Sequence, residues 1–438
     1  MKKVLSILLS AVLLLSVFCI SASAVSFDND VKIYSDSVFM VNLDANMPVF
    51  EKNPDEKLYP ASLTKIMTYI IAAEYFDDYD NTRVEVTQDV FDYIDRNGMT
   101  SSGLEYHIGE KMTVTDLLYA LMVPVGHDAA LVLSDYISTD SGTDFVTMMN
   151  DKATELNCES THFANPTGVH DNNHYTTARD LYKITKYAMG LPLFSKICST
   201  STYYLEGDDY PIVTTNYLID AARGGDYYYT YATGVKNGTT VEAGRCLVST
   251  AMYDGYTYMC ICLHAPYDEK EDENPQYCME EAANLFRWAF LNLKYVKHST
   301  ASTPICEQKV DHAWDTDSIL LVPETDLNII LPADCKDGDV TIVPDSTAPV
   351  SAPISKGDVV TTATVLYKGT EFMKINLVSH DDVKLSPILY TTDIIKSILT
   401  SFWFLLAVAI VVILFVVYVA VSSSYNKKKN IDKKRKYK

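Results

Sequence analysis

An uninterrupted apolar run of about 20 residues lies near the C-terminal end of the chain, from Phe402 to Val421. A helix of this length spans the roughly 30 Å hydrocarbon layer of a bilayer. Lysine and arginine dominate the residues behind the run, and the positive-inside bias keeps such a cluster in the cytoplasm. The pattern predicts a membrane helix over residues 399–421, a basic cytoplasmic tail over 422–438 and an extracellular location for the rest of the chain. A buried core helix is the alternative, and the basic cluster argues against it.

The N-terminal residues have the layout of a secretory signal peptide. Two lysines precede an apolar stretch that ends in the small residues 22–24. An uncleaved membrane helix is the alternative, but the stretch is short for a bilayer. We expect residues 1–24 to be removed, so that the mature chain begins near Val25.

The exported part of the chain is strongly acidic. The formal net charge of the whole chain is −21, while the tail contributes +7 and the leader +2, so residues 25–426 carry −30. This charge repels nucleic acid and anionic lipid headgroups. We therefore expect no nucleic-acid partner, and a domain that is held away from the membrane surface by more than its tether.

Two hydrophobicity patterns divide the chain between the membrane signals. Up to about residue 293, strand-like runs mix with helical patterns, which predicts a mixed helix and sheet domain. From about residue 299 to residue 383 short β-type runs alternate with Asp, Gly and Pro turns, which predicts a small β-sandwich or barrel-like module. The segment from Ser386 to Ile398 is typical of a short amphipathic lead-in to the membrane helix. The helical patterns cover Ser62 to Tyr75, Val114 to Leu133, Thr143 to Leu156, Thr177 to Met189 and Pro275 to Leu293, and the strand-like runs cover Val38 to Val41, Arg245 to Ala251, Tyr256 to Leu263, Ser318 to Val322 and Thr361 to Tyr367.

Cysteine usage does not indicate a disulfide framework. Eight of the nine cysteines lie after the leader, and their spacing is scattered. A chain of this size does not depend on disulfides for its stability. We expect mostly buried free thiols, with Cys260 and Cys262 packed in the core rather than bound to a metal.

Ser62 and Lys65 are candidate catalytic residues. They begin a helical pattern, and their three-residue spacing puts the hydroxyl and the ammonium on one face of a helix. A serine hydroxyl becomes a nucleophile when a neighbouring base takes its proton, and a lysine whose pKa is lowered can be that base. By itself Ser-x-x-Lys is a common pattern, so further motifs have to support the assignment.

Further motifs follow in an order that resembles D-alanyl-D-alanine carboxypeptidases, the low-molecular-weight penicillin-binding proteins of the serine peptidase type. Lys236, Asn237 and Gly238 stand where that family has Lys-Thr-Gly on a strand beside the nucleophile. The run from Ala243 to Val248 is similar to the Ala-Gly-x-Cys-Leu-Val that usually follows. Other stretches that resemble the family are residues 38–53, 161–168, 174–180 and 352–357. The resemblance covers about residues 30–385.

The resemblance implies an α+β fold. A β-lactamase/transpeptidase-like domain, with an antiparallel sheet flanked by helices, is expected over residues 25–295. A small all-β domain is expected over residues 300–385, followed by the membrane helix. The implied partners are peptidoglycan stem peptides as substrate and β-lactam antibiotics as covalent inhibitors, and the resemblance implies no cofactor and no metal.

The resemblance also assigns roles to residues. Ser62 would attack the carbonyl carbon of the penultimate D-alanine, Lys65 would accept the proton, and the terminal D-alanine would leave. Lys236 would bind the free carboxylate of the substrate and lower the pKa of Lys65. Asn237, Gly238 and Thr239 complete the substrate-binding strand. The backbone N–H groups of Ser62 and Thr239 would form the oxyanion hole.

The second motif departs from the family pattern Ser-x-Asn. Val125 stands where a hydroxyl is expected and His127 where an amide is expected. Valine cannot relay a proton to the leaving group. A neutral His127 can bond the substrate or Lys65, or replace part of the relay, whereas a protonated His127 would make Lys65 a weaker base. In the third motif Asn237 replaces a threonine, which exchanges a hydroxyl for an amide.

Two functions from different classes follow from these departures. In the first, the chain is an active carboxypeptidase with altered efficiency or substrate choice, in which His127 joins Ser62 and Lys65 as a candidate catalytic residue. In the second, it is a degenerate relative that binds stem peptides or a partner protein without turnover. Retention of both Ser62 and Lys65 favours the enzyme.

Other peptidase and hydrolase classes fit less well. A β-lactamase shares the first and third motifs, but no glutamate in the matched region can be assigned as a deacylating base. A zinc peptidase lacks His-Glu-x-x-His, and His170 and His174 lie in a stretch that Pro166 and Gly168 make a loop. We expect both histidines to be surface or structural residues. His107 and Arg179 are expected to be packing or salt-bridge partners.

Overall fold

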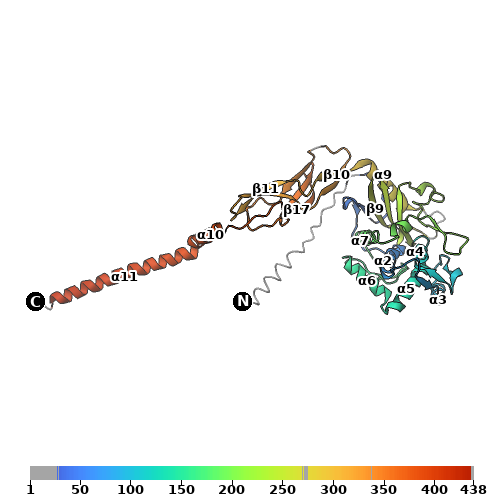
Figure 1. The fold of residues 1–438 in the computed structure, drawn as a ribbon, viewed down its shortest axis with the longest axis horizontal. Helices are drawn as coiled ribbons and strands as arrows, with labels where there is room; N and C mark the ends of the chain where they lie inside the picture. Colours follow the sequence, from blue (N-terminus) through green and yellow to red (C-terminus); the bar gives the residue numbers. More distant parts are fainter. Residues whose placement is uncertain (1–26, 28, 269, 271–274, 337, 436–438) are drawn as a thin grey trace. The chain divides into compact units, whose positions relative to one another are not determined.

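The computed structural model describes residues 27, 29–268, 270, 275–336 and 338–435 (Figure 1). The predicted leader therefore lies outside the described residues. The chain forms two compact units. The first runs to His298 and also includes Asn328–Asp339, and the second contains Ser299–Leu327 and the residues from Val340 onward. The sequence pattern did not predict that residues 328–339 return to the first unit.

A five-stranded antiparallel sheet forms the centre of the first unit. Its order is β2-β1-β9-β8-β7, with strands β1 (Ser37–Asn42), β2 (Met47–Lys52), β7 (Ala232–Thr240), β8 (Gly244–Tyr253) and β9 (Tyr256–Ala265). Consecutive side chains of a strand point to opposite faces, and in β8 every residue from Gly244 to Ala251 is buried. Both faces of this strand are therefore covered, including its polar residues Arg245, Ser249 and Thr250. The strand-like runs predicted at residues 38–41, 245–251 and 256–263 are confirmed.

Helices of the first unit surround α2 (Lys65–Tyr75), which contacts four other helices. These four are α4 (Val114–Met122), α5 (His127–Ser141), α6 (Phe145–Glu155) and α7 (Ala178–Ala188). The other helices of this unit are α3 (Gln88–Arg96), α8 (Phe194–Cys198), α9 (Tyr277–Asn292) and the 3-10 turns η1 (Ala61–Thr64), η2 (Leu104–His107) and η3 (Gly225–Tyr227). Short strand pairs join β3 (Arg83–Glu85) to β4 (Lys111–Thr113), β5 (Thr202–Tyr203) to β6 (Ile212–Val213), and β10 (Leu293–Ser299) to β13 (Leu327–Pro332). These neighbours bury every residue of α2 from Lys65 to Ala73.

The single helix predicted from Val114 to Leu133 is wrong, because the chain turns between α4 and α5. Pro124 lies in the turn, and Gly126 has a φ of +67°. A Cβ atom on Gly126 would lie 2.4 Å from the carbonyl oxygen of Leu121, so this turn requires glycine. The break makes His127 the first residue of α5 and puts the second motif on a turn.

The second unit is all-β up to its C-terminal helices, as predicted. A six-stranded sheet has the order β14-β16-β17-β12-β11-β15. Its strands are β11 (Cys306–Asp311), β12 (Ser318–Pro323), β14 (Val340–Pro344), β15 (Val350–Ser351), β16 (Val359–Tyr367) and β17 (Thr370–Ser379). Leu321, Ala363 and Leu377 are fully buried in its core.

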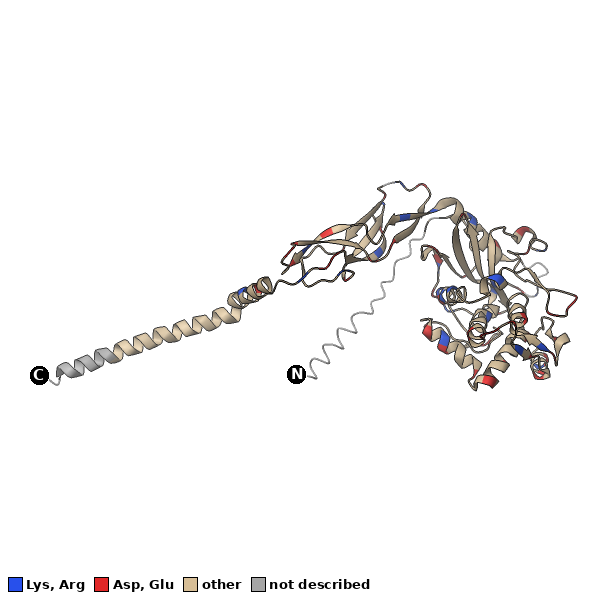
Figure 2. Ribbon diagram, viewed as in Figure 1, with Lys and Arg blue, Asp and Glu red and all other residues tan. Residues whose placement is uncertain are grey.

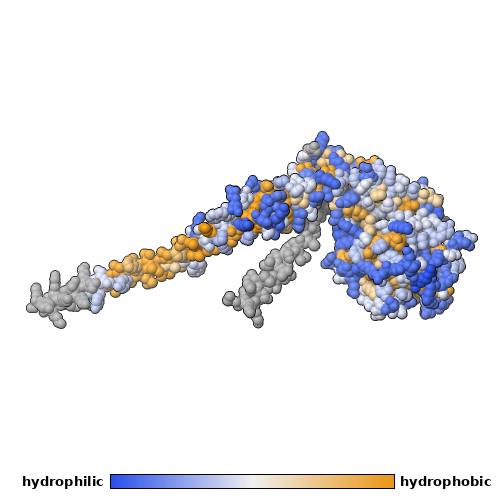
Figure 3. Space-filling model, in the orientation of Figure 1, coloured by the Kyte–Doolittle hydropathy of each residue, from blue (hydrophilic) through white to orange (hydrophobic). Residues whose placement is uncertain are grey.

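Two helices end the described chain: α10 (Pro387–Thr400) and α11 (Phe402–Arg435). Residues Phe402–Tyr425 are long and apolar enough to cross a membrane, and none of this segment is buried against the protein. Figure 2 shows no charged residue along it, and Figure 3 shows its continuous apolar surface. The helix begins at Phe402, three residues later than predicted, because α10 ends at Thr400. In α10, Ile394, Ile395 and Ile398 are exposed, which agrees with the predicted amphipathic lead-in.

The eight cysteines after the leader are free thiols. Six are buried and two, Cys306 and Cys335, are half-buried. Cys260 and Cys262 are both fully buried on β9, with their Sγ atoms 3.7 Å apart. The prediction of mostly buried free thiols is confirmed.

Candidate active site

Ser62 lies in η1, immediately before α2. Its Oγ accepts a hydrogen bond of 3.0 Å from the Nζ of Lys65, so the local spacing does bring the hydroxyl and the amine together. Two glycines allow the chain to pack closely around this turn. A Cβ atom on Gly238 would lie 2.6 Å from the Ser62 nitrogen, and one on Gly168 would lie 2.0 Å from the Ala61 carbonyl oxygen. These glycines let β7 and the loop before His170 reach the backbone of the nucleophile.

Lys65 is fully buried at the base of the site. Burial holds the pKa of its ammonium well below the usual value of 10.5, the charge of Lys236 lowers it further, and Asp128 opposes both. Its Nζ also donates a 2.5 Å hydrogen bond to the carbonyl oxygen of Thr167. A lysine whose pKa is lowered in this way, at hydrogen-bond distance from a serine hydroxyl, can act as its base.

Lys236 is 2% exposed and lies on β7. Its Nζ donates a 2.7 Å hydrogen bond to the carbonyl oxygen of Pro124, which joins the third motif to the turn that carries the second. Burial lowers the pKa of Lys236 to about 8. Lys236 therefore keeps most of its charge at neutral pH, while it shifts the titration of Lys65.

His127 and Val125 lie at this turn, both half-buried. Burial and the charge of Lys65 lower the pKa of His127 to about 3, and Lys236 acts in the same direction against Asp128. The imidazole is therefore neutral at pH 7, and the protonated form considered from the sequence is not the one that this site favours. The Nδ1 atom of His127 is buried without a hydrogen-bond partner among the described residues. A neutral ring with a free nitrogen can accept or pass on a proton.

The loop before η2 also belongs to this site, and the sequence patterns did not single it out. Asp128 is fully buried, and its carboxylate accepts hydrogen bonds from the Ser101 hydroxyl and the Ser102 N–H, both at 2.7 Å. The Ser102 hydroxyl also bonds Asp128 and accepts a 3.1 Å bond from the Gly126 N–H. Asp128 therefore fastens this loop to the turn of the second motif. The pair of serines followed by Gly103, a loop-forming combination, is the only signal that the sequence offers.

Asn237, Gly238 and Thr239 follow Lys236 on β7, the last strand in the order of the sheet. The outer edge of β7 pairs with no strand among the described residues, and an extended peptide can add to an unpaired edge of this kind. The Oδ1 of Asn237 accepts a 2.7 Å hydrogen bond from the Oγ1 of Thr215, a residue that no sequence motif singles out.

Other polar residues considered from the sequence are structural. His174 is buried, its Nε2 lies 2.8 Å from the Thr64 hydroxyl, and burial lowers its pKa to about 4. His170 packs edge-on against the ring of Tyr59. His107 contacts Glu110 and Asp208, and Arg179 contacts Glu51 and Asp55, as the predicted ion-pair partners. Among the described residues no group of three or more His, Cys, Asp or Glu side chains is arranged to hold a metal.

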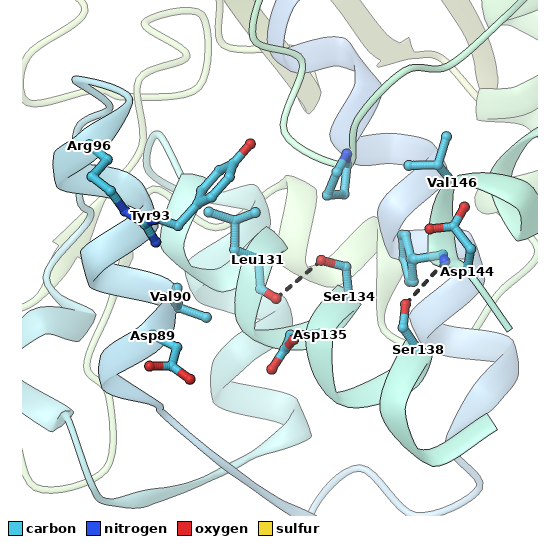
Figure 4. Close-up of a pocket in the computed structure, with 12 residues that line it drawn as sticks. Asp89, Val90, Tyr93, Arg96, Leu131, Ser134, Asp135, Ser138, Asp144 and Val146 are labelled. Atoms are coloured by element: carbon cyan, nitrogen blue, oxygen red, sulfur yellow. Dashed lines mark hydrogen bonds between the residues drawn. The ribbon is translucent and has the colours of Figure 1, made fainter. Parts of the chain in front are cut away.

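A cavity of about 370 Å³ lies between α3 and α5, beside the start of α6 (Figure 4). Tyr93 and Arg96 point into it from α3, and Leu131 and Asp135 from α5. It contains none of the predicted catalytic residues. Pro166, which precedes the Thr167 carbonyl that binds Lys65, contributes to its lining, so the cavity borders the active site without being part of it.

Comparison with known proteins agrees with this geometry. Residues 22–266 match the D-alanyl-D-alanine carboxypeptidase family, and residues 301–385 match the C-terminal domain of penicillin-binding protein 5. The chain is 34% identical to the D-alanyl-D-alanine carboxypeptidase DacF of Bacillus subtilis over 260 residues, which is 57% of this chain and 63% of that protein. It is 27% identical to the carboxypeptidase DacA of Haemophilus influenzae over 384 residues, which is 86% of this chain and 92% of the relative.

Solved structures give the same result. Penicillin-binding protein 5 of Haemophilus influenzae is 25% identical with a TM-score of 0.66, covering 82% of this chain and all of that one. A variant of the DD-transpeptidase of Streptomyces K15 is 28% identical with a TM-score of 0.51, covering 59% of this chain and 99% of that one. The predicted fold class is confirmed. The chain belongs to the D-alanyl-D-alanine carboxypeptidase family, whose members are hydrolases of the serine peptidase type.

Proposed function

We propose that this protein removes the terminal D-alanine from peptidoglycan stem peptides through an acyl-enzyme on Ser62. The observation that carries the proposal is the 3.0 Å contact between the Ser62 hydroxyl and a buried Lys65 whose pKa is lowered. A module that only binds peptides would not need this pair. Family membership also favours turnover over the degenerate alternative.

The proposed reaction has two stages. The Ser62 oxygen bonds to the carbonyl carbon of the penultimate D-alanine while its proton moves to Lys65. The backbone N–H groups of Ser62 and Thr239 stabilise the oxyanion, and Lys236 with Asn237 binds the free carboxylate. The C–N bond then breaks, D-alanine leaves with a proton on its amine, and water hydrolyses the ester to restore Ser62.

The proton that the leaving amine needs is assigned to His127. Val125 has no hydroxyl to relay it. The neutral His127 ring lies where the charges of both Lys65 and Lys236 affect its pKa, and its Nδ1 has no partner among the described residues. The ring is hydrogen-bonded to the backbone of Thr100, so Nδ1 is the nitrogen proposed to take a proton and to pass it to the leaving amine.

This relay predicts a specific pattern of variants. His127→Asn alone is expected to lower kcat for D-alanine release by about 100-fold, because no relay group remains. Val125→Ser with His127→Asn restores the family's hydroxyl and amide and is expected to recover most of the rate. The measurement is D-alanine release from a diacetyl-lysyl-D-alanyl-D-alanine peptide by the detergent-solubilised full chain. An unchanged rate in His127→Asn would remove His127 from the mechanism, and a double variant much faster than the natural chain would show that the natural site is impaired.

The two lysines predict a bell-shaped dependence of kcat/KM on pH. Lys65 must be deprotonated to act as a base, so kcat/KM rises as the pH passes its lowered pKa. Lys236 must be protonated to bind the carboxylate, so kcat/KM falls above a pH of about 8. His127, with a pKa of about 3, contributes no limb near neutrality. Lys236→Arg keeps its charge at high pH and should remove the descending limb, and a limb that persists in this variant would assign it to another group.

The partners and the location follow from the same proposal. Penicillins carry a reactive amide and a carboxylate, so they should acylate Ser62 as substrate analogues. We further propose that α11 anchors the chain with the first unit outside the cell and the basic tail in the cytoplasm. Protection of the tail from protease added to intact cells is the measurement that checks this orientation.

A further inference from the structure

The side chain of Asn237 is held by a residue outside the three motifs. Thr215 lies 22 positions earlier in the chain, and its hydroxyl donates a 2.7 Å hydrogen bond to the Asn237 Oδ1. Both residues are half-buried, so the bond is partly shielded from water. Asn237 is also the position at which the third motif departs from its family. The departure and the unexpected contact therefore concern the same side chain.

Thr215 lies in a hydrogen-bonded segment that follows β6. The neighbouring Thr214 donates its N–H to the Ser201 carbonyl at 2.8 Å and accepts a 2.6 Å bond from the Nη2 of Arg223 on its own carbonyl. Arg223 is held in turn by a 2.5 Å ion pair with Asp220, whose carboxylate is 6% exposed. These two bonds hold the backbone of Thr214, the residue before Thr215, and so limit the conformations from which the Thr215 hydroxyl meets Asn237.

In the structure the oxygen end of the Asn237 amide makes this contact, which leaves the Nδ2 group on the other side. Because the Asn237 Oδ1 is the acceptor for Thr215, its Nδ2 group carries two N–H donors for which no acceptor occurs among the described residues. An amide held in this orientation only donates toward its free side, where a threonine hydroxyl can both donate and accept. A carboxylate is an acceptor only, so it matches the Nδ2 group and is repelled by an Oδ1.

We propose that Thr215 is a positioning residue that orients the Asn237 amide to bind the free terminal carboxylate of the peptide substrate, and so selects against peptides with an amidated end. The inference rests on the proposed function, since it assigns the part of the site that binds the carboxylate. Without the Thr215 hydroxyl the amide can rotate and present its oxygen. That oxygen opposes a carboxylate but accepts from a terminal carboxamide.

The test is steady-state kinetics with Thr215→Val, a nearly isosteric change that removes only the hydroxyl. The substrates are the diacetyl-lysyl-D-alanyl-D-alanine peptide and its C-terminal carboxamide, with the full chain in detergent. The KM for the free acid is expected to rise about 5- to 10-fold, as for the loss of one hydrogen bond, with kcat nearly unchanged. The preference for acid over amide should fall by about the same factor. Thr154→Val is the matched control, because its exposed hydroxyl bonds only within α6, and its kinetics should equal those of the natural chain.

A second background separates positioning from a general structural effect. In Asn237→Thr the residue at the third motif needs no orienting partner, so adding Thr215→Val should change KM by less than about twofold. An equal rise in KM in both backgrounds, or no rise in the natural one, overturns the inference. If the natural chain releases no D-alanine at all, the result contradicts the proposed function, and with it the inference that rests on that function. If the natural chain is active and Thr215→Val is silent, only the inference fails.

Discussion

Ser62→Ala is expected to abolish the covalent adduct that a penicillin forms with this protein. The β-lactam carbonyl is attacked by the Ser62 oxygen, and alanine has no atom in its place. Intact-mass analysis of the detergent-solubilised chain should show one penicillin added to the natural protein and none to the variant. The change removes one half-buried hydroxyl, so the fold should be retained, which circular dichroism can check.

Ser195→Ala is the matched control for this experiment. Ser195 is an exposed serine of α8, and its loss should leave the adduct complete. An adduct that survives in Ser62→Ala would place the nucleophile elsewhere. If the natural chain forms no adduct, the hypothesis of a non-catalytic relative is favoured. Penicillin and the peptide substrate are both expected to acylate Ser62 with Lys65 as the base, so a site that cannot react with one should not react with the other.

Lys65→Met is expected to lower kcat/KM by about 1,000-fold or more, because the serine loses its base. Methionine is close to lysine in length and carries no charge. The variant loses the hydrogen bond to the Thr167 carbonyl, which destabilises the fold, but it also removes a fully buried polar amine and replaces it by an apolar side chain. These effects oppose each other, so the melting temperature should change by only about 5 °C or less.

The comparison of activity with thermal unfolding tells lost chemistry from lost structure. Lys196→Met, on the exposed side of α8, should change neither quantity. A Lys65→Met protein that melts far below the natural chain would mean that Lys65 is first a structural residue. A stable variant with full activity would require another base for Ser62.

The contact between Ser62 and Lys65 could be predicted because it is local. Three residues of helical rise fix the distance between the two side chains, whatever the rest of the fold does. The position of Lys236 could not be predicted from local spacing, because it lies far along the chain. Only the resemblance of its motif indicated that it lies beside Ser62 and Lys65. The strand and helix patterns located many of the elements, but they joined α4 and α5 across Pro124 and Gly126 and did not indicate α3 or α8.

Thr215, Ser101 and Ser102 could not be found from the sequence. Each is a common polar residue in a loop, and its partner is more than 20 positions away. Nothing in its neighbourhood distinguishes it from a solvated threonine or serine. The neutral state of His127 could not be predicted from the sequence either, because its pKa depends on burial and on the charges of two lysines that the fold brings close to it. Such properties are set by long-range packing rather than by local pattern.

Both lysines of the site are anchored to main-chain oxygens: Lys65 to Thr167 and Lys236 to Pro124. Every amino acid has a main-chain carbonyl oxygen, so these two hydrogen bonds do not depend on which side chains surround them. The side chains of Val125 and His127 can therefore be exchanged while the two lysine amines stay where they are. This separation makes the second motif the position at which to vary side chains in search of new specificity.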